Sequence, residues 1–256
     1  MSAETTTVLE YRLLGGFGLT RDGVPVTPGA WQRPMAARLV RFLLIKRAFA
    51  QEDLLLDTFW RDCDPAAGRR CLAVSLSRCR SVLRPGAIVA SDRAYRLVVE
   101  PGDGVDVDDF EVAAATAFER PAGPGRTAAL ERAAALWTGE PLPEDRYADW
   151  TRAWRDALTD RHREVLVALA DAYAAAGEHG AALRAARRML DADPLDEGAH
   201  RRVMAGYAAL GRRSRALDQY RCCRRVLVDA VGIEPARETA DLHARILAGD
   251  EVVRAA

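Results

Sequence analysis

Arginine and serine side chains are concentrated in one short stretch of the sequence, residues 64–84 (DPAAGRRCLAVSLSRCRSVLR). Guanidinium groups and serine hydroxyls bind phosphate oxygens and base edges, which is the chemistry of a protein that contacts nucleic acid. No acidic residue lies among these side chains to neutralise them. The predicted DNA contacts in this stretch are Arg69, Arg70, Val74, Ser77, Arg78, Arg80, Ser81 and Arg84.

The same stretch predicts one amphipathic helix. Leu72, Leu76, Cys79 and Leu83 recur at steps of four, three and four, which places them on one side of a helix. A helix that docks by this apolar side and turns its arginines outward suits the major groove of DNA. The alternative is an ordinary amphipathic surface helix, which would usually carry acidic residues as well.

The charge of the chain is distributed unevenly between its two halves. The formal net charge is zero, yet residues 1–100 hold 15 Lys and Arg against 10 Asp and Glu, whereas the remainder holds 22 against 27. The N-terminal half is therefore basic, and it is the candidate for binding phosphate.

The elements around the arginine-rich helix predict a winged helix-turn-helix. Short strands are expected within 8–27, with a hairpin turn at Asp22-Gly23, and helices over 32–46 and 51–60. After Pro85-Gly86, two apolar stretches surround Ser91-Asp92-Arg93 and predict a second hairpin, which is the wing. Arg93 lies in the turn of this wing.

The rest of the chain predicts helices with an internal repeat. A Gly/Asp-rich joint at 102–109 marks the expected domain boundary, and breaks are expected at 121–125 and 138–145. Four residues recur at an offset of 34, which is the period of tetratricopeptide repeats; they are Tyr173, Gly177, Ala182 and Leu183, repeated as Tyr207, Gly211, Ala216 and Leu217. The prediction is a mostly α protein with a small β portion: a winged helix over 1–104 and an all-α tetratricopeptide-like domain over 105–256.

Other function classes find little support in the sequence. The histidines form no HxxxH pair with a carboxylate and no recognisable catalytic triad, and GGFG at 15–18 lacks the GxGxxG pattern of dinucleotide sites. Cys63, Cys71 and Cys79 lack the short spacing of zinc ligands. We expect no catalytic residue, no cofactor and no metal. No apolar run approaches the roughly 20 residues of a membrane span, and the N-terminus has no signal-peptide pattern, so we expect a cytoplasmic, reduced protein without a membrane partner.

Three further segments follow the winged helix in a specific order: VDVDDFE (105–111), LWTGEPL (136–142) and VGIEPARET (231–239). This arrangement resembles the Streptomyces antibiotic regulatory protein family, whose members join an OmpR-type winged helix to a bacterial transcriptional activation domain. The resemblance implies a sequence-specific transcriptional activator of a biosynthetic gene cluster. It also implies binding to direct repeats in double-stranded DNA near a promoter, contact with RNA polymerase and its sigma factor, and a homodimer on DNA.

The resemblance extends to the arginine-rich helix, with some departures. Ser77, Arg78 and Arg80 match the family's Ser-Arg-x-Arg. Ala73 and Val74 stand where the family commonly has a polar residue, and Val74 suits contact with a thymine methyl group.

The wing also departs, since it has Ala94-Tyr95 where the family often has Gly-Tyr. The resemblance implies that Arg93, in the turn of the wing, contacts the phosphate backbone or the minor groove of the DNA. These departures support a second interpretation, in which a tetratricopeptide-type protein-interaction scaffold carries a winged helix that has lost specific DNA binding. For Arg80 and Arg84, a solvated surface position remains an alternative to a phosphate contact.

Overall fold

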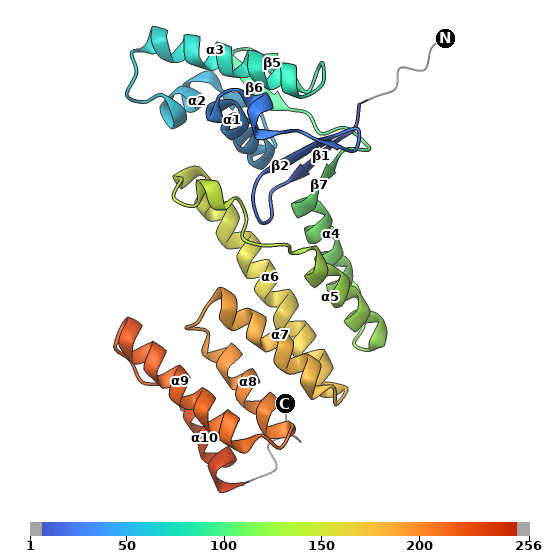
Figure 1. Ribbon diagram of the computed structural model, residues 1–256, viewed down its shortest axis with the longest axis vertical. Helices are drawn as coiled ribbons and strands as arrows, with labels where there is room; N and C mark the ends of the chain where they lie inside the picture. The colour runs from blue at the N-terminus through green and yellow to red at the C-terminus, as the bar shows by residue number, and fades with distance from the viewer. Residues whose placement is uncertain (1–6, 250–256) are drawn as a thin grey trace. The chain divides into compact units, whose positions relative to one another are not determined.

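The computed structural model describes residues 7–249 (Figure 1). Internal contacts divide these residues into two compact units. The N-terminal unit contains residues 7–110 and 137–159, and the C-terminal unit contains residues 111–136 and 160–249. Small sheets and helices build the N-terminal unit, and helices build the described part of the C-terminal unit, which confirms the predicted fold class.

A four-stranded sheet of order β3-β2-β1-β7 begins the N-terminal unit (Figure 1). The central strand β1 pairs antiparallel with β2 and parallel with β7. Asp22 and Gly23 turn between β2 and β3 with φ angles of 50° and 77°, which confirms the predicted hairpin. The strands are β1 (Leu9–Arg12), β2 (Gly18–Arg21), β3 (Val24–Pro25) and β7 (Gly104–Val105).

Strand β7 lies in the segment predicted as a joint between domains. Asp103 Oδ1 accepts a hydrogen bond from Leu9 N at 2.9 Å, and the Asp106 carboxylate accepts from Leu13 N and Leu14 N at 2.8 and 2.9 Å. These carboxylates satisfy backbone donors at the start of β1 and just after its end. The Gly/Asp-rich segment therefore contributes a strand and two carboxylates to the N-terminal unit.

Three helices and a second sheet complete the winged helix-turn-helix. The second sheet has the order β4-β6-β5, so the hairpin β5-β6 is fastened to the strand that precedes α2. The predicted apolar side of α3 is buried, and the helix ends at Val82, two residues earlier than predicted. The elements are η1 (Pro28–Trp31), α1 (Pro34–Lys46), β4 (Ala50–Gln51), α2 (Glu52–Phe59), α3 (Pro65–Val82), β5 (Ile88–Ser91) and β6 (Ala94–Leu97).

Residues 138–145 were predicted only as a break between helices, yet they are part of the N-terminal unit and bond to residues 13–15. Gly15 N donates to Glu140 O at 2.9 Å, and Leu142 N donates to Leu13 O at 2.8 Å. A Cβ atom on Gly139 would lie 2.8 Å from the Gly15 Cα, so this close crossing of two backbones requires glycine. The short helix η2 (Pro143–Asp145) ends the segment.

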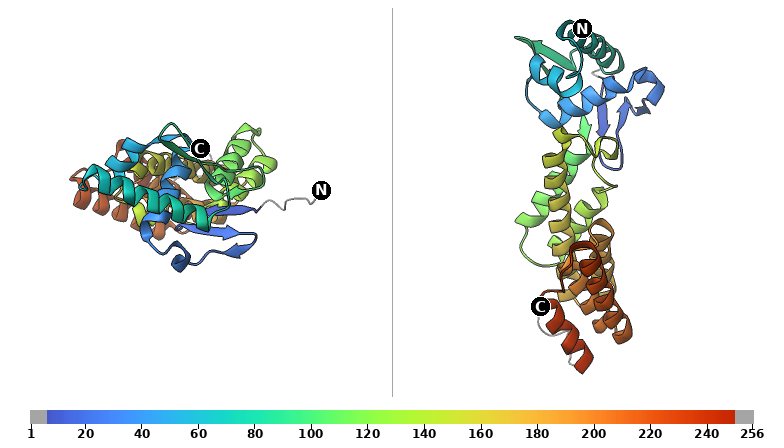
Figure 2. Two further views of the ribbon diagram at one scale, coloured as in Figure 1. Left: turned by 90° about the horizontal axis from the view of Figure 1, so that it is seen from above. Right: turned by 90° about the vertical axis from the view of Figure 1, so that its left-hand side faces the viewer.

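The C-terminal unit is a series of helices joined by short turns (Figures 1 and 2). Helices α4 and α6 begin in the N-terminal unit and end in this one. Its core includes Leu183, Met204 and Tyr207, packed with Leu242 and Ile246 of the last helix. The helices are α4 (Asp106–Glu119), α5 (Pro124–Leu136), α6 (Asp149–Ala175), α7 (His179–Ala192), α8 (Glu197–Ala209), α9 (Arg213–Val231) and α10 (Arg237–Ala248).

The 34-residue repeat corresponds to two helix-turn-helix units, α6-α7 and α8-α9. Glu178 N donates to Tyr173 O at 2.8 Å, and Arg212 N donates to Tyr207 O at 2.8 Å, so the same bond closes both turns. Gly177 and Gly211 adopt the left-handed conformation in these turns, with φ of 76° and 70°. The two tyrosines differ, because Tyr207 is buried in the core whereas Tyr173 is half-exposed.

Candidate nucleic-acid interface

Helix α3 exposes one face along its length. The side chain of Val74 is 51 % exposed although it is aliphatic. Leu72, Leu76 and Cys79, on the opposite side, are buried. The predicted contact residues on the exposed face are Arg69, Arg70, Val74, Ser77, Arg80 and Ser81, with Arg78 half-buried beside them.

The position of α3 is fixed at both ends and along its buried side. Asp64 Oδ1 caps the helix by accepting from Ala66 N at 2.9 Å and Ala67 N at 3.2 Å. Gly68 allows the close approach of α2, because a Cβ there would lie 3.2 Å from the Leu56 Cδ2. Burial raises the pKa of the Cys79 thiol to about 12, so Cys79 stays a neutral core residue.

Three arginines of α3 keep their charge free of acidic partners. Within residues 7–249, no carboxylate lies within 4.0 Å of the guanidinium nitrogens of Arg70, Arg78 or Arg80. A guanidinium without an ion pair retains its full attraction for phosphate. The exposed face of α3 therefore carries positive charge together with a hydroxyl, Ser77, and an apolar contact, Val74.

Two other predicted contact residues share one acidic partner. Arg69 Nε lies 3.1 Å from Glu52 Oε1, and Arg93 Nη2 lies 3.8 Å from the same oxygen. Glu52 N also donates to Arg93 O at 2.8 Å, which ties the wing turn to the start of α2. Glu52 thus positions Arg69 and Arg93 next to each other and neutralises part of their charge. No local sequence pattern indicates this role, because Glu52 is 17 residues from Arg69 and 41 residues from Arg93 in the chain.

Arg84 requires a correction to the predicted set. It lies beyond the end of α3, its side chain is only 4 % exposed, and its guanidinium donates to both Asp103 oxygens at 2.7 and 2.8 Å. It also donates to Thr7 O at 3.3 Å. A guanidinium held this way is not free to contact a phosphate, so Arg84 joins the end of α3 to the N-terminal sheet.

A small hollow beside the C-terminal half of α3 adds residues that the sequence did not suggest. Arg78 and Ser81 line it together with Arg21, Pro25 and Thr27 from the first hairpin and the segment after it. These residues lie some fifty positions from α3 in the sequence, and no spacing pattern links them. Arg21 therefore adds a second guanidinium near Arg78.

The wing turn is built without the glycine that such turns favour. Asp92 and Arg93 both adopt the left-handed conformation, with φ of 46° and 58°. Asparagine or aspartate followed by glycine is the usual pair for this turn, so Asp92 fits its position whereas Arg93 is strained. The strained residue is the one that presents its side chain at the tip of the wing, where 74 % of that side chain is exposed.

The described part of the chain contains neither a metal site nor a membrane-spanning helix. Within residues 7–249, no group of three or more His, Cys, Asp or Glu side chains is arranged to hold a metal ion. In the same range, no helix combines the length and the apolar character needed to cross a lipid bilayer.

Comparison with known proteins identifies the helical part of the chain. The model of the bacterial transcriptional activator domain matches residues 105–247. The chain belongs to the Streptomyces antibiotic regulatory protein family. The match begins at β7 and includes helices α4 to α10.

Relatives in the family share sequence with nearly the whole chain. The regulatory protein AfsR of Streptomyces griseus is 28 % identical over 256 residues, and the match covers 96 % of this chain but 25 % of that protein. The transcriptional regulatory protein MoaR1 of Mycobacterium tuberculosis is 25 % identical, with 96 % of this chain and 82 % of that protein covered. These relatives are named as regulators and not as enzymes, as the sequence predicts.

A solved structure shows the same fold. Mycobacterium tuberculosis EmbR, in a complex with a low-affinity phosphopeptide, superposes with a TM-score of 0.74 at 25 % sequence identity. The superposition covers 95 % of this chain and 66 % of the EmbR chain. Both units of this chain therefore have counterparts in a family member of known structure.

The family segment at 231–239 has a structural role in this chain. Thr239 is fully buried, and its hydroxyl donates to Glu197 Oε2 at 2.7 Å. The same oxygen accepts from Ala236 N at 2.9 Å. Glu197 of α8 thereby satisfies two donors at the start of α10, which fixes the last helix against the repeat.

Proposed function

We propose that this protein is a transcriptional activator that recognises double-stranded DNA with its N-terminal winged helix. The observation that carries the proposal is the exposed face of α3, where Arg70, Arg78 and Arg80 have no acidic partner within residues 7–249 while the opposite face is buried. Arg70, Val74, Ser77 and Arg78 would contact base edges in the major groove, and Arg69, Arg80 and Arg93 would contact phosphates.

The family supplies the rest of the proposal. Residues 1–104 would act as the DNA-binding domain and residues 105–256 as the activation domain; the family match over residues 105–247 supports this division. The protein would act in the cytoplasm. Two copies would bind direct repeats near a promoter and would contact RNA polymerase and its sigma factor. One winged helix binds weakly, so two linked copies on a repeated site raise the affinity. The regulated genes would be a biosynthetic cluster.

A second candidate is a protein-interaction scaffold that has lost specific DNA binding. It is favoured by the apolar pair Ala73 and Val74 on the exposed face and by the carboxylate of Glu52 beside Arg69 and Arg93. Both features reduce the polar and positive surface that α3 offers to a duplex.

Selection from random duplexes separates the two candidates. An activator should enrich a directly repeated site, and thymine should recur where Val74 meets the groove. Replacing those thymines with deoxyuridine removes only the methyl group, and we expect a loss of affinity of about threefold to tenfold in fluorescence anisotropy. Failure to enrich any sequence at low salt would contradict the activator and favour the scaffold.

Glu52 provides a prediction that depends on its position between two arginines. Replacing Glu52 by glutamine frees both guanidiniums, so affinity for the selected duplex should rise about threefold to tenfold at low salt. The matched control is Asp53→Asn, which removes one charge from the same turn of α2, where Asp53 forms no ion pair within residues 7–249. Equal gains in the two variants would show that only the net charge matters.

A further inference from the structure

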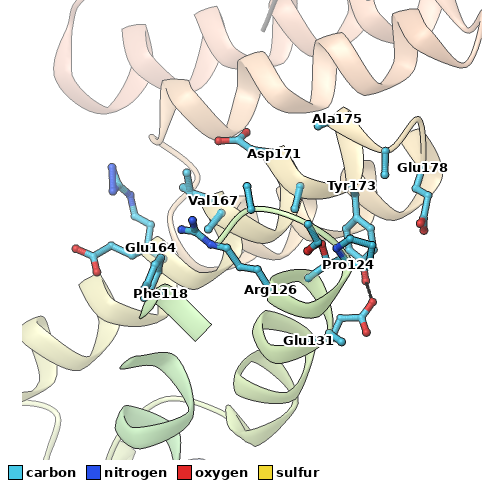
Figure 3. Close-up of a pocket in the computed structure, with 18 residues that line it drawn as sticks. Phe118, Pro124, Arg126, Glu131, Glu164, Val167, Asp171, Tyr173, Ala175 and Glu178 are labelled. Carbon is cyan, nitrogen blue, oxygen red and sulfur yellow. Dashed lines mark hydrogen bonds between the residues drawn. The ribbon is translucent and has the colours of Figure 1, made fainter. Parts of the chain in front are cut away.

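A hollow of about 970 Å³ lies within the C-terminal unit (Figure 3). It opens between the C-terminal half of α6 on one side and, on the other, α5 with the turn that precedes it. Its volume is at the upper end of the range of small-molecule sites in proteins, about 300–1,000 Å³. The hollow plays no part in the proposed DNA contacts, because all of those lie in the N-terminal unit.

The floor of the hollow is apolar and consists of small side chains. Val167 and a row of alanines on α6, among them Ala168, Ala172 and Ala175, line it. An alanine side chain ends at its Cβ, so these positions leave space that a larger residue would fill. A floor of this kind is suited to the apolar body of a ligand.

One end of the hollow carries negative charge beside an aromatic ring. The Tyr173 hydroxyl donates to the Glu131 carboxylate, and Glu178 lies next to this pair (Figure 3). Burial, with Glu131 and Glu178 nearby, raises the pKa of Tyr173 to about 12, so the phenol stays neutral. Arg184 also lies near Tyr173 and acts to lower its pKa, but neither carboxylate forms an ion pair within residues 7–249. This end therefore has two carboxylates that no guanidinium pairs.

At the other end of the hollow, Glu164 and Arg163 are held in ion pairs, and Arg126 packs on an aromatic ring. Glu164 binds Arg161 at 2.8 Å, and Arg163 binds Asp196 at 3.0 Å. The Arg126 guanidinium lies over the Phe118 ring, 5.6 Å from its centre. A ligand cation thus meets its strongest attraction at the Tyr173 end.

We propose that this hollow binds a small organic amine. Its apolar body lies on the alanine floor, and its protonated nitrogen lies against the Tyr173 ring between Glu131 and Glu178. The carboxylates accept charge-assisted hydrogen bonds from the ammonium group, and the ring face adds a cation–π contact. A metabolite of this chemistry would then be sensed by the helical unit.

Calorimetric titration of the full chain with 4-phenylbutylamine, 4-phenylbutan-1-ol and 4-phenylbutyrate tests this assignment. The three probes share a phenylalkyl group and differ in their terminal group, which is cationic, neutral or anionic. We expect saturable binding of the amine and at least tenfold weaker binding of the alcohol and the acid. Equal affinity for amine and alcohol would overturn the proposal. So would the absence of binding by every amine in a panel of arylalkyl, alicyclic and polyamine bodies.

Variants locate the site. The double replacement Glu131→Gln and Glu178→Gln should weaken amine binding at least tenfold, whereas Glu111→Gln, an exposed glutamate of α4 outside the hollow, should leave it unchanged. Ala172→Leu fills the floor and should abolish binding. Circular dichroism melting of each variant without ligand checks its fold, and the glutamine pair keeps the test decisive if the leucine variant unfolds. Wild-type affinity in the folded double variant would place the amine elsewhere and overturn the proposal.

Discussion

Replacing Asp103 by alanine is expected to lower the free energy of unfolding of the N-terminal unit by about 3–5 kcal/mol. Asp103 and Arg84 are 2 % and 4 % exposed, so the substitution leaves a buried guanidinium without its partner. It also removes the acceptor for Leu9 N and Glu100 N, at 2.9 and 2.8 Å. Few single positions in this unit combine a lost ion pair with lost backbone acceptors.

Denaturant unfolding followed by tryptophan fluorescence measures this loss. All five tryptophans lie within the N-terminal unit, so the signal reports that unit alone. Asp108→Ala is the matched control, because Asp108 pairs with Arg47 in a largely exposed position and should cost less than about 1 kcal/mol. Equal effects of the two substitutions would contradict the role assigned to the buried pair.

The stabilisation by Asp103 should depend on pH. Burial acts to raise the pKa of this carboxyl, and the hydrogen bonds from Arg84, Glu100 N and Leu9 N outweigh burial, so the pKa lies below its ordinary value. The ion pair therefore stabilises the fold fully above the unfolded pKa of about 3.9, and the stabilisation is lost as the pH falls through the lower folded pKa. The difference between wild type and Asp103→Ala should shrink correspondingly below about pH 4.

The double replacement Arg78→Ala and Arg80→Ala should abolish useful DNA binding. Each arginine contact contributes about 1–3 kcal/mol, so the pair should reduce affinity for the selected duplex by roughly two orders of magnitude or more. If both guanidiniums neutralise phosphates, the slope of log K against log salt becomes shallower by about 1.8. Fluorescence anisotropy at about 50 and 200 mM salt measures both quantities.

A charge-matched control separates local contacts from net charge. Arg221→Ala and Arg224→Ala remove two exposed arginines from α9 of the C-terminal unit and should leave affinity and salt slope unchanged. Unchanged affinity together with an unchanged slope in the α3 variant would contradict the proposed interface. Loss of affinity with an unchanged slope would instead assign Arg78 and Arg80 to base contacts.

Local patterns were sufficient to predict the arginine-rich helix α3 and the repeat. The steps between Leu72, Leu76 and Cys79 predict which side of α3 is buried, because helical periodicity is set by near neighbours. Gly177 and Gly211 likewise mark two turns that close with the same hydrogen bond, 34 residues apart. These features depend on contacts within a few turns of helix.

The features that the sequence did not predict depend on pairs of residues that lie far apart in the chain. Arg84 has the same sequence context as the other arginines of 69–84, and only the carboxylate of Asp103 and burial separate it from them. Asp145 likewise gives no local signal, yet it accepts from Arg38 Nε and Arg41 Nε at 2.9 and 2.6 Å across more than one hundred residues. The sequence alone contains no pattern that pairs such residues.

The chain passes from one compact unit to the other three times, after Phe110, Leu136 and Thr159. Gene fusion transfers a contiguous segment of sequence, whereas the N-terminal unit is built from two segments that are separated in the sequence. A piece that ends at residue 104 leaves behind the carboxylate of Asp106, the carboxylate of Asp145 and the segment that bonds to Leu13 and Gly15. A winged helix transplanted from this chain onto another helical array would have to take residues 137–159 with it. The two halves are therefore expected to be inherited together, which is consistent with relatives that match this chain over 96 % of its length.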